Sequence, residues 1–147
     1  MKLTVAWIGK TKSSAVQALT DEYLKRLRQY SEAEGVSVKD EAALLKLCGR
    51  AHGSTRRWLA LLDSRGKQLS SEELAQFVRD HQDRNPLPLV FAIGPADGFT
   101  AQLRDHADLV LSLGKMTLAH ELARVVLLEQ VYRAFTILKG HPYHVGH

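Results

Sequence analysis

The densest cluster of reactive side chains lies near the end of the chain, in the segment Gly140-His-Pro-Tyr-His144. Its imidazoles and phenol accompany a glycine and a proline, which end the preceding helical pattern. Histidine exchanges protons near neutral pH, and tyrosine can donate a hydrogen bond or stack on a planar ring. Packing explains such a tail poorly, so the sequence favours a functional role for Tyr143 and His144.

Other polar residues have simpler interpretations. Glu129 and Arg133 are spaced as an i, i+4 ion pair on a helix, and His120 falls in a first turn, where packing or capping is favoured over catalysis. Cys48 is the only cysteine, and its helical spacing from Leu44 predicts a buried structural thiol. The sequence contains three basic clusters, Lys10-Thr-Lys12, Lys25-Arg26 and Arg56-Arg57. Each could bind phosphates or simply form a solvated face.

Apolar runs predict the strands of a sheet. They span Leu3 to Ile8, Trp58 to Leu62, Leu87 to Ile93 and Leu109 to Leu113, with helical patterns between them. This alternation predicts an α/β fold, a mostly parallel sheet with helices on both faces. A short extra strand is expected from Val36 to Val38, before a helical pattern from Glu41 to Cys48.

Capping signals delimit the predicted helices. The first runs from about Ser14 to Tyr30, and Ser70 with Glu73 forms a capping box for another. A long helix is expected from about Leu118 to Leu138, capped by Thr117 and ended by Gly140. Its apolar residues exceed one face, which indicates packing on the sheet and on a partner subunit.

Each predicted strand is followed closely by a glycine, at Gly9, Gly66, Gly94 and Gly114. In parallel α/β sheets ligands bind beyond the carboxyl ends of the strands, so these loops are the expected site. For any one glycine, simple termination of the strand is the alternative. The Rossmann fingerprint and the phosphate loop are both absent from the sequence.

Composition limits the class of protein. The 147 residues are expected to form one domain, 1–147, and 45% hydrophobic with 24% charged residues is typical of a globular chain. No apolar run is long enough to span a membrane, and the start lacks the features of a signal peptide, so a cytoplasmic location is expected. The formal charge of +4 favours polyanionic partners.

The last third of the sequence resembles the ribosomal RNA large-subunit methyltransferase H family of the SPOUT class. The matching segments are Leu111 to His120, Arg124 to Ala134 and Gly140 to His144. Upstream, the resemblance continues through Met1-Lys-Leu, Leu61 to Glu73 and Phe91 to Gly98. The chain departs from the family pattern at Pro95, Ala119 and Val145.

The resemblance implies a SPOUT-like fold with a C-terminal trefoil knot and a homodimer that methylates N3 of a pseudouridine in 23S ribosomal RNA. It implies S-adenosylmethionine as methyl donor, without a metal. The implied cofactor-binding residues are Leu62, Gly94, Leu113, Gly114, Lys115, Met116, Thr117 and Leu118. Tyr143 and His144 are the implied catalytic residues. A SPOUT enzyme for another RNA and a non-catalytic ribosome-binding module are the alternatives.

Overall fold

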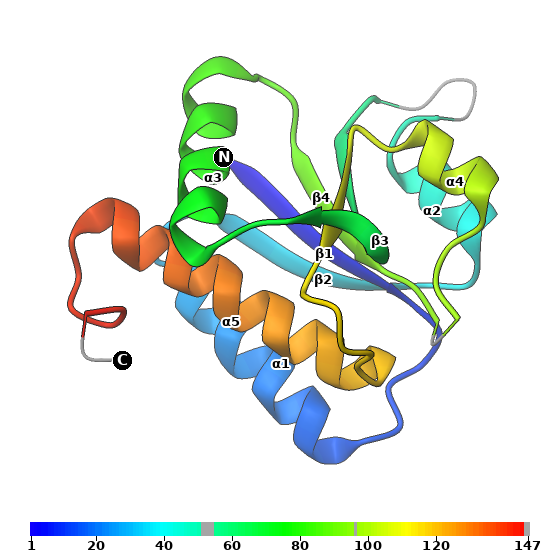
Figure 1. Cartoon of the computed structure of the whole chain (residues 1–147), viewed down its shortest axis with the longest axis horizontal. Coiled ribbons are helices and arrows are strands. Elements are labelled where there is room, and N and C mark those ends of the chain that lie inside the picture. The colour runs from blue at the N-terminus through cyan, green and yellow to red at the C-terminus, as the bar shows by residue number, and fades with distance from the viewer. Residues whose placement is uncertain (51–54, 96, 146–147) are drawn as a thin grey trace.

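Strands and helices alternate along the chain in a computed structural model that describes residues 1–50, 55–95 and 97–145 (Figure 1). The elements are β1 (Lys2–Ile8), α1 (Ser14–Leu27), β2 (Glu32–Val38), α2 (Glu41–Leu47), β3 (Trp58–Gln68), α3 (Ser71–Arg84), β4 (Leu89–Ile93), α4 (Ala101–His106), β5 (Leu109–Ser112) and α5 (His120–Lys139). This order confirms the predicted α/β class.

The strands form one sheet in the order β2-β1-β4-β3-β5, and all of its pairs are parallel. The central strand β4 is buried along its whole length, which explains its uninterrupted apolar sequence. Trp7 pairs with Ile93, and Leu62 pairs with the same residue from the other side. The carboxyl ends of β1, β4 and β3 therefore meet at one edge of the sheet.

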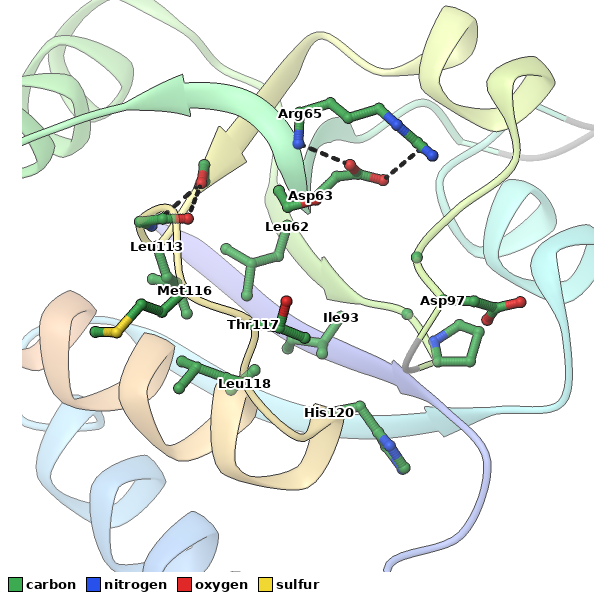
Figure 2. Close-up of a pocket in the computed structure, with 17 residues that line it drawn as sticks. Leu62, Asp63, Arg65, Ile93, Asp97, Leu113, Met116, Thr117, Leu118 and His120 are labelled. Carbon is green, nitrogen blue, oxygen red and sulfur yellow. Dashed lines mark hydrogen bonds and ion pairs between the residues drawn. The ribbon is translucent and has the colours of Figure 1, made fainter.

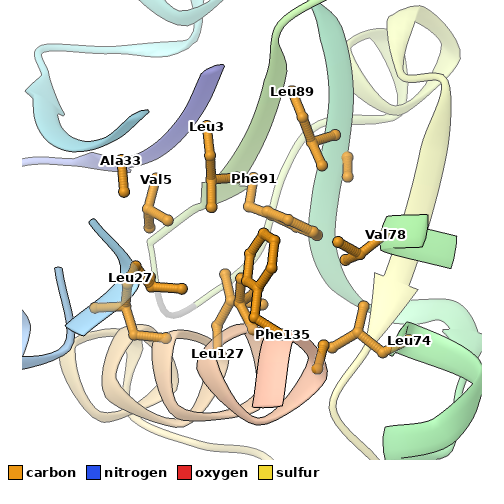
Figure 3. Close-up of a cluster of buried hydrophobic side chains, with 14 of the residues drawn as sticks. Leu3, Val5, Leu27, Ala33, Leu74, Val78, Leu89, Phe91, Leu127 and Phe135 are labelled. Carbon is orange, nitrogen blue, oxygen red and sulfur yellow. The ribbon is translucent and has the colours of Figure 1, made fainter. Parts of the chain in front are cut away.

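Helices cover both faces of the sheet, as the alternating pattern predicts. On one face α1, α3 and α5 bury a core in which Phe135 and Leu27 meet Leu3, Val5 and Phe91 from the strands (Figure 3). On the other face, a smaller cluster joins Leu44 of α2 and Leu103 of α4 to the opposite sides of the same strands. The buried thiol of Cys48 belongs to this second cluster, which confirms its structural assignment.

The helix ends match most of the capping signals. Ser70 and Glu73 form the predicted capping box of α3, and Gly140 ends α5 in the left-handed conformation with a φ of 69°. The predicted cap at Thr117 is wrong, because α5 begins two residues later behind Ala119, without a side-chain cap. Glu121, in the first turn of α5, instead accepts hydrogen bonds from the amides that precede α1.

Two strands extend beyond their predicted ends. The strand predicted from Val36 to Val38 begins earlier, at Glu32, because β2 pairs with β1 along its full length. β3 continues to Gln68 through a register shift against β5. Gly66 therefore lies inside β3 and does not end it, and a Cβ at this position would lie 2.6 Å from the backbone of Val110.

Candidate active site

A cavity opens at the carboxyl edge of the sheet, where three segments of the chain converge (Figure 2). They are the part of β3 from Leu62 to Arg65, where its pairing with β4 ends, the loop after β4, and the loop between β5 and α5. The described residues that line the cavity are Leu62, Asp63, Ser64, Arg65, Ile93, Gly94, Pro95, Asp97, Gly98, Ser112, Leu113, Gly114, Met116, Thr117, Leu118, His120 and Ala123.

The cavity combines an apolar wall with strand-end backbone. Leu62, Ile93, Leu113 and Leu118 contribute aliphatic side chains from different segments (Figure 2). Pro95 and the glycines bring main chain to the same space, although proline has no amide to donate. Aliphatic walls beside backbone polar groups suit a flat heteroaromatic ring, which is apolar on its faces and polar on its edge.

Gly94 is closely packed against a buried aromatic ring. A Cβ at this position would lie 3.0 Å from the ring of Phe99, a buried residue of the same loop after β4. At position 114 the backbone conformation favours glycine, because its φ of 136° lies in a region that residues with side chains rarely adopt. Its amide hydrogen-bonds to Ser112 Oγ at 3.1 Å, and this contact shapes the loop that enters α5.

A buried carboxylate joins two of the three segments. Asp63 follows the apolar part of β3, and its side chain is 2% exposed. It accepts hydrogen bonds from the amide of Arg65 at 3.0 Å and from the amide of Phe99 at 3.3 Å. The guanidinium of Arg104 lies 3.7 Å away and also donates to the carbonyl of Phe99. Asp63 therefore fixes the loop after β4 against the end of β3.

Most of the residues proposed from the sequence for cofactor binding line this cavity. They are Leu62, Gly94, Leu113, Gly114, Met116, Thr117 and Leu118. Lys115 belongs to the same loop, but it is exposed and is absent from the described lining. Sequence reasoning did not single out Asp63 or Arg65 as site residues, although both fall within the segment Leu61 to Glu73 that carries the family resemblance. It also favoured packing for His120, which lines the cavity.

The tail follows the carboxyl end of α5 (Figure 1), whereas His120 and Ala123 at the start of α5 line the cavity. The helix α5 has 20 residues and is therefore about 30 Å long at the usual rise per residue. Tyr143 and His144 follow the end of this helix, whereas the cavity adjoins its beginning. Within one chain, the structure therefore does not bring the two predicted catalytic residues to the other predicted site residues.

A polar network holds the tail against its own chain. Tyr143 donates a hydrogen bond from its hydroxyl to Glu129 at 3.0 Å, and Glu129 also pairs with Arg133, which confirms that predicted ion pair. The two ring nitrogens of His144 lie 2.9 Å from Arg133 Nη1 and 2.8 Å from the carboxylate of Glu72 in α3. Burial, with the hydrogen bonds that Tyr143 makes, raises the pKa of its phenol, so this group is protonated at neutral pH.

Comparison with known proteins places this architecture in a class. A family model described as "Predicted SPOUT methyltransferase" matches residues 1–144. The chain is 60% identical over 147 residues to the ribosomal RNA large subunit methyltransferase H of Koribacter versatilis (strain Ellin345), and the match covers 100% of both chains. It is 43% identical to the protein of that name from Geobacter sulfurreducens (strain ATCC 51573 / DSM 12127 / PCA), over 98% of this chain and 99% of the relative.

The chain belongs to the SPOUT methyltransferase family and, within it, to the ribosomal RNA large subunit methyltransferase H group. The resemblance noted in the sequence is thereby confirmed. Solved structures share the fold at low sequence identity. A probable methyltransferase from Bordetella pertussis Tohama I has a TM-score of 0.59 at 12% identity, over 90% of this chain and 93% of that one.

A second solved structure was determined with a methyl donor bound. The SpoU methyltransferase AviRb from Streptomyces viridochromogenes, in complex with the cofactor AdoMet, has a TM-score of 0.52 at 16% identity. The match covers 90% of this chain and 57% of that one. At this identity, the likeness supports the fold and not the positions of individual site residues.

Proposed function

We propose that the protein transfers a methyl group from S-adenosylmethionine to N3 of a pseudouridine in 23S ribosomal RNA, as a homodimer in the cytoplasm. The observation that carries this proposal is the convergence of three strand-end segments on one cavity, in a chain that is 60% identical to a ribosomal RNA large subunit methyltransferase H. Membership of the family supports the class of reaction, and the resemblance supplies the atom that is methylated.

The residues of the cavity fit the methyl donor. Leu62, Ile93 and Leu118 provide apolar surface for the two faces of an adenine ring, and the loop backbone around Gly94 and Gly114 can meet its polar edge. When bound, S-adenosylmethionine would supply a methyl group made electrophilic by its sulfonium sulfur. The protein's task is to hold the accepting nitrogen in line with that methyl group.

The tail supplies groups suited to the nucleotide. N3 of pseudouridine is an imide nitrogen, which becomes nucleophilic when its proton leaves. Histidine is a residue type that serves as a general base near neutral pH, and a tyrosine ring such as that of Tyr143 can stack on a base or hydrogen-bond to it. In their observed positions, these groups follow the carboxyl end of α5, whereas the cavity of their own chain adjoins its start.

A second copy of the chain resolves this separation. α1 and α5 pack side by side, and each exposes a leucine, with Leu19 44% exposed and Leu122 49% exposed. A two-fold axis that crosses α5 near its middle would place the tail of one subunit beside the cavity of the other. We therefore assign the exposed faces of α1 and α5 to the dimer interface and the tail to the partner's active site.

The alternative of a non-catalytic ribosome-binding module rests on Pro95, which lines the cavity without an amide donor, and on Val145, where the family has a basic residue. Binding of the methyl donor separates the two functions. Calorimetry should show micromolar affinity for S-adenosylmethionine if the protein is an enzyme. If S-adenosylmethionine does not bind even at millimolar concentration, the protein is better described as a non-catalytic ribosome-binding module.

A bulky residue at the mouth of the cavity tests the site itself. Thr117 is exposed and lines the cavity, so Thr117→Trp should lower the affinity for S-adenosylmethionine about tenfold or more, by occupying the ligand's space. Lys115→Trp is the matched control, because this side chain lies outside the described lining of the cavity. Calorimetry measures affinity, and methyl transfer is measured on ribosomes from a strain that lacks the gene. Equal affinity in the two variants would overturn the assignment.

A further inference from the structure

A short basic loop borders the candidate active site. The segment Gly9 to Ser13, which we call the lysine loop, follows β1 and carries Lys10 and Lys12. Because Trp7 pairs with Ile93, the carboxyl end of β1 lies beside the end of β4, where Gly94 and Pro95 enter the cavity. The lysine loop is therefore adjacent to the active site, although its residues are not part of the described lining.

Both ends of the lysine loop are fixed to the fold. The amide of Gly9 donates to the carbonyl of Val38 at 3.0 Å, and the hydroxyl of Ser37 donates to the carbonyl of Gly9 at 2.6 Å. At its other end, the Glu121 carboxylate accepts from the amides of Lys12 at 3.2 Å and Ser13 at 3.0 Å. Ser13 also caps α1, which makes this end part of a helix terminus.

The middle of the loop is held by a buried arginine. Arg124 of α5 is 1% exposed, and its Nη1 donates to the hydroxyl of Thr11 at 2.8 Å. Its guanidinium lies 3.9 Å from the ring centre of Trp7, and its buried Nε has no hydrogen-bond partner. Within the described chain, no carboxylate lies within 4.0 Å of this guanidinium.

Arg124 forms no close ion pair, although the charge of Glu121 on the same helix acts on it, and burial without such a pair is costly. A leucine or methionine would fill such a core position at lower cost. Arg124 adds a hydrogen bond to Thr11, between the two lysines, a longer one of 3.5 Å to Thr20 of α1, and a positive charge next to the loop. Lys10 and Lys12 are both exposed, and neither forms an ion pair with a described residue. The anchored loop therefore presents two unneutralised ammonium groups beside the cavity.

We propose that the lysine loop binds phosphates of the substrate RNA next to the target nucleotide, and that Glu121 and Arg124 are positioning residues for this loop. The inference rests on the proposed function, because it assumes an RNA substrate. Ammonium groups bind phosphates as point charges, and their attachment to a fixed backbone sets the register of the strand without reading its bases. The loop thereby orients the nucleotide for the cavity.

A paired set of charge removals tests the binding role. Lys10→Gln/Lys12→Gln should raise the Michaelis constant for ribosomes from a gene-deletion strain about tenfold and reduce the log–log salt slope of RNA binding by about two. Lys2→Gln/Lys46→Gln is the matched control. It removes the same charge from exposed positions, one of them at the opposite end of β1. S-adenosylmethionine affinity should be unchanged in both variants.

The positioning role has a test in which charge and geometry predict opposite results. Glu121→Gln raises the net charge by one, so a purely electrostatic loop would bind RNA more tightly. If the carboxylate positions the loop, weaker bonds to the amides of Lys12 and Ser13 should instead raise the Michaelis constant for RNA several-fold. Tighter RNA binding by Glu121→Gln would overturn the positioning role.

The results also separate this inference from the function on which it rests. If the wild-type chain neither binds nor methylates ribosomes, both proposals fall. If the wild type methylates ribosomes, and Lys10→Gln/Lys12→Gln behaves like the Lys2→Gln/Lys46→Gln control in both the Michaelis constant and the salt slope, the proposed function stands and the lysine loop is a solvated turn. A selective loss in the lysine-loop variant supports both.

Discussion

Gly94 both lines the cavity and packs closely against a buried ring. The sequence places it after a strand, where close approach of a ligand is expected, but in the structure the missing Cβ also makes room for Phe99. Gly94→Ala should lower the free energy of unfolding by about 1–3 kcal/mol, because the ring must shift in a packed core. Chemical denaturation measures this change.

A double-mutant cycle identifies the source of that loss. Phe99→Leu removes part of the ring that a Cβ at position 94 would contact, so Gly94→Ala should cost less in the Phe99→Leu background. Strictly additive effects would show that the glycine is required for another reason. Because of this packing role, Thr117→Trp is the better means of blocking the cavity.

The buried thiol predicts a specific alkaline instability. Burial raises the pKa of Cys48 from 9.0 to about 11, so the folded chain keeps a proton that the unfolded chain loses in this interval. The unfolded state then binds fewer protons, and the free energy of unfolding should fall by about 1.4 kcal/mol per pH unit between these values. Cys48→Ala should remove this contribution, and parallel pH profiles for the two proteins would contradict it.

At the residue scale, most of the cofactor-binding residues proposed from the sequence line the cavity, but the buried carboxylate beside them is not among those proposed. Leu113 to Leu118 were identified from a continuous motif, which needs no knowledge of the fold. Asp63 matters because its carboxylate reaches the amide of Phe99, 36 positions away in the chain. A contact of that range depends on which strands are neighbours, and neither spacing nor residue type in the sequence reveals it.

At the scale of elements, α5 buries apolar residues on one side and exposes one on the other. Leu127 is fully buried against the sheet, whereas Leu122 is 49% exposed on the outer side. Leu122→Lys should therefore weaken the proposed dimer while the monomer stays folded, because the charge is added to a surface that only a partner would cover. Light scattering at micromolar concentration measures the assembly state.

The control for this experiment adds the same charge elsewhere. Gln102 is exposed on α4, which covers the opposite face of the sheet, so Gln102→Lys should leave assembly unchanged. A wild-type monomer at micromolar concentration, or equal assembly of the two variants, would show that α5 does not form the interface. Circular dichroism confirms that each variant is folded.

Local signals predicted elements where burial and sequence pattern agree. β4 was recognised because both of its faces are buried, and α3 because its capping box is encoded within four residues. The sequence does not predict the end of β3, since its polar residues continue the strand through a shifted register in which Lys67 and Gln68 pair with β5. The start of α5 was misplaced because Thr117 belongs to the loop that lines the cavity.

At the scale of the whole molecule, the trefoil knot stays a prediction. Strand order and register describe which segments pair, but they do not specify how the last segment passes relative to the rest of the chain. True knots are rare in proteins, so only the family resemblance suggests one here.

The described part of the chain also contains no helix long and apolar enough to cross a membrane.

Sharing of sites between subunits can be tested by mixing variants. Thr117→Trp should block the cavity, and His144→Ala should lower methyl transfer by a factor of about 10² by removing an acid–base group. If the tail serves the partner's cavity, a heterodimer of these two variants contains one site with an open cavity and an intact His144. Activity should therefore be recovered in tagged, purified heterodimers although each homodimer is impaired.

The reverse pairing gives the opposite outcome. A heterodimer of the wild-type chain with the Thr117→Trp/His144→Ala double variant keeps one complete site if each tail serves its own subunit. If tails are exchanged, the open cavity receives the altered tail and the intact tail meets the blocked cavity, so neither site is complete. Full activity at one site of this heterodimer, with no recovery in the first, would show that Tyr143 and His144 act within their own chain. Recovery in the first alone would establish the shared site, because the two heterodimers contain the same substitutions and differ only in which chain carries them.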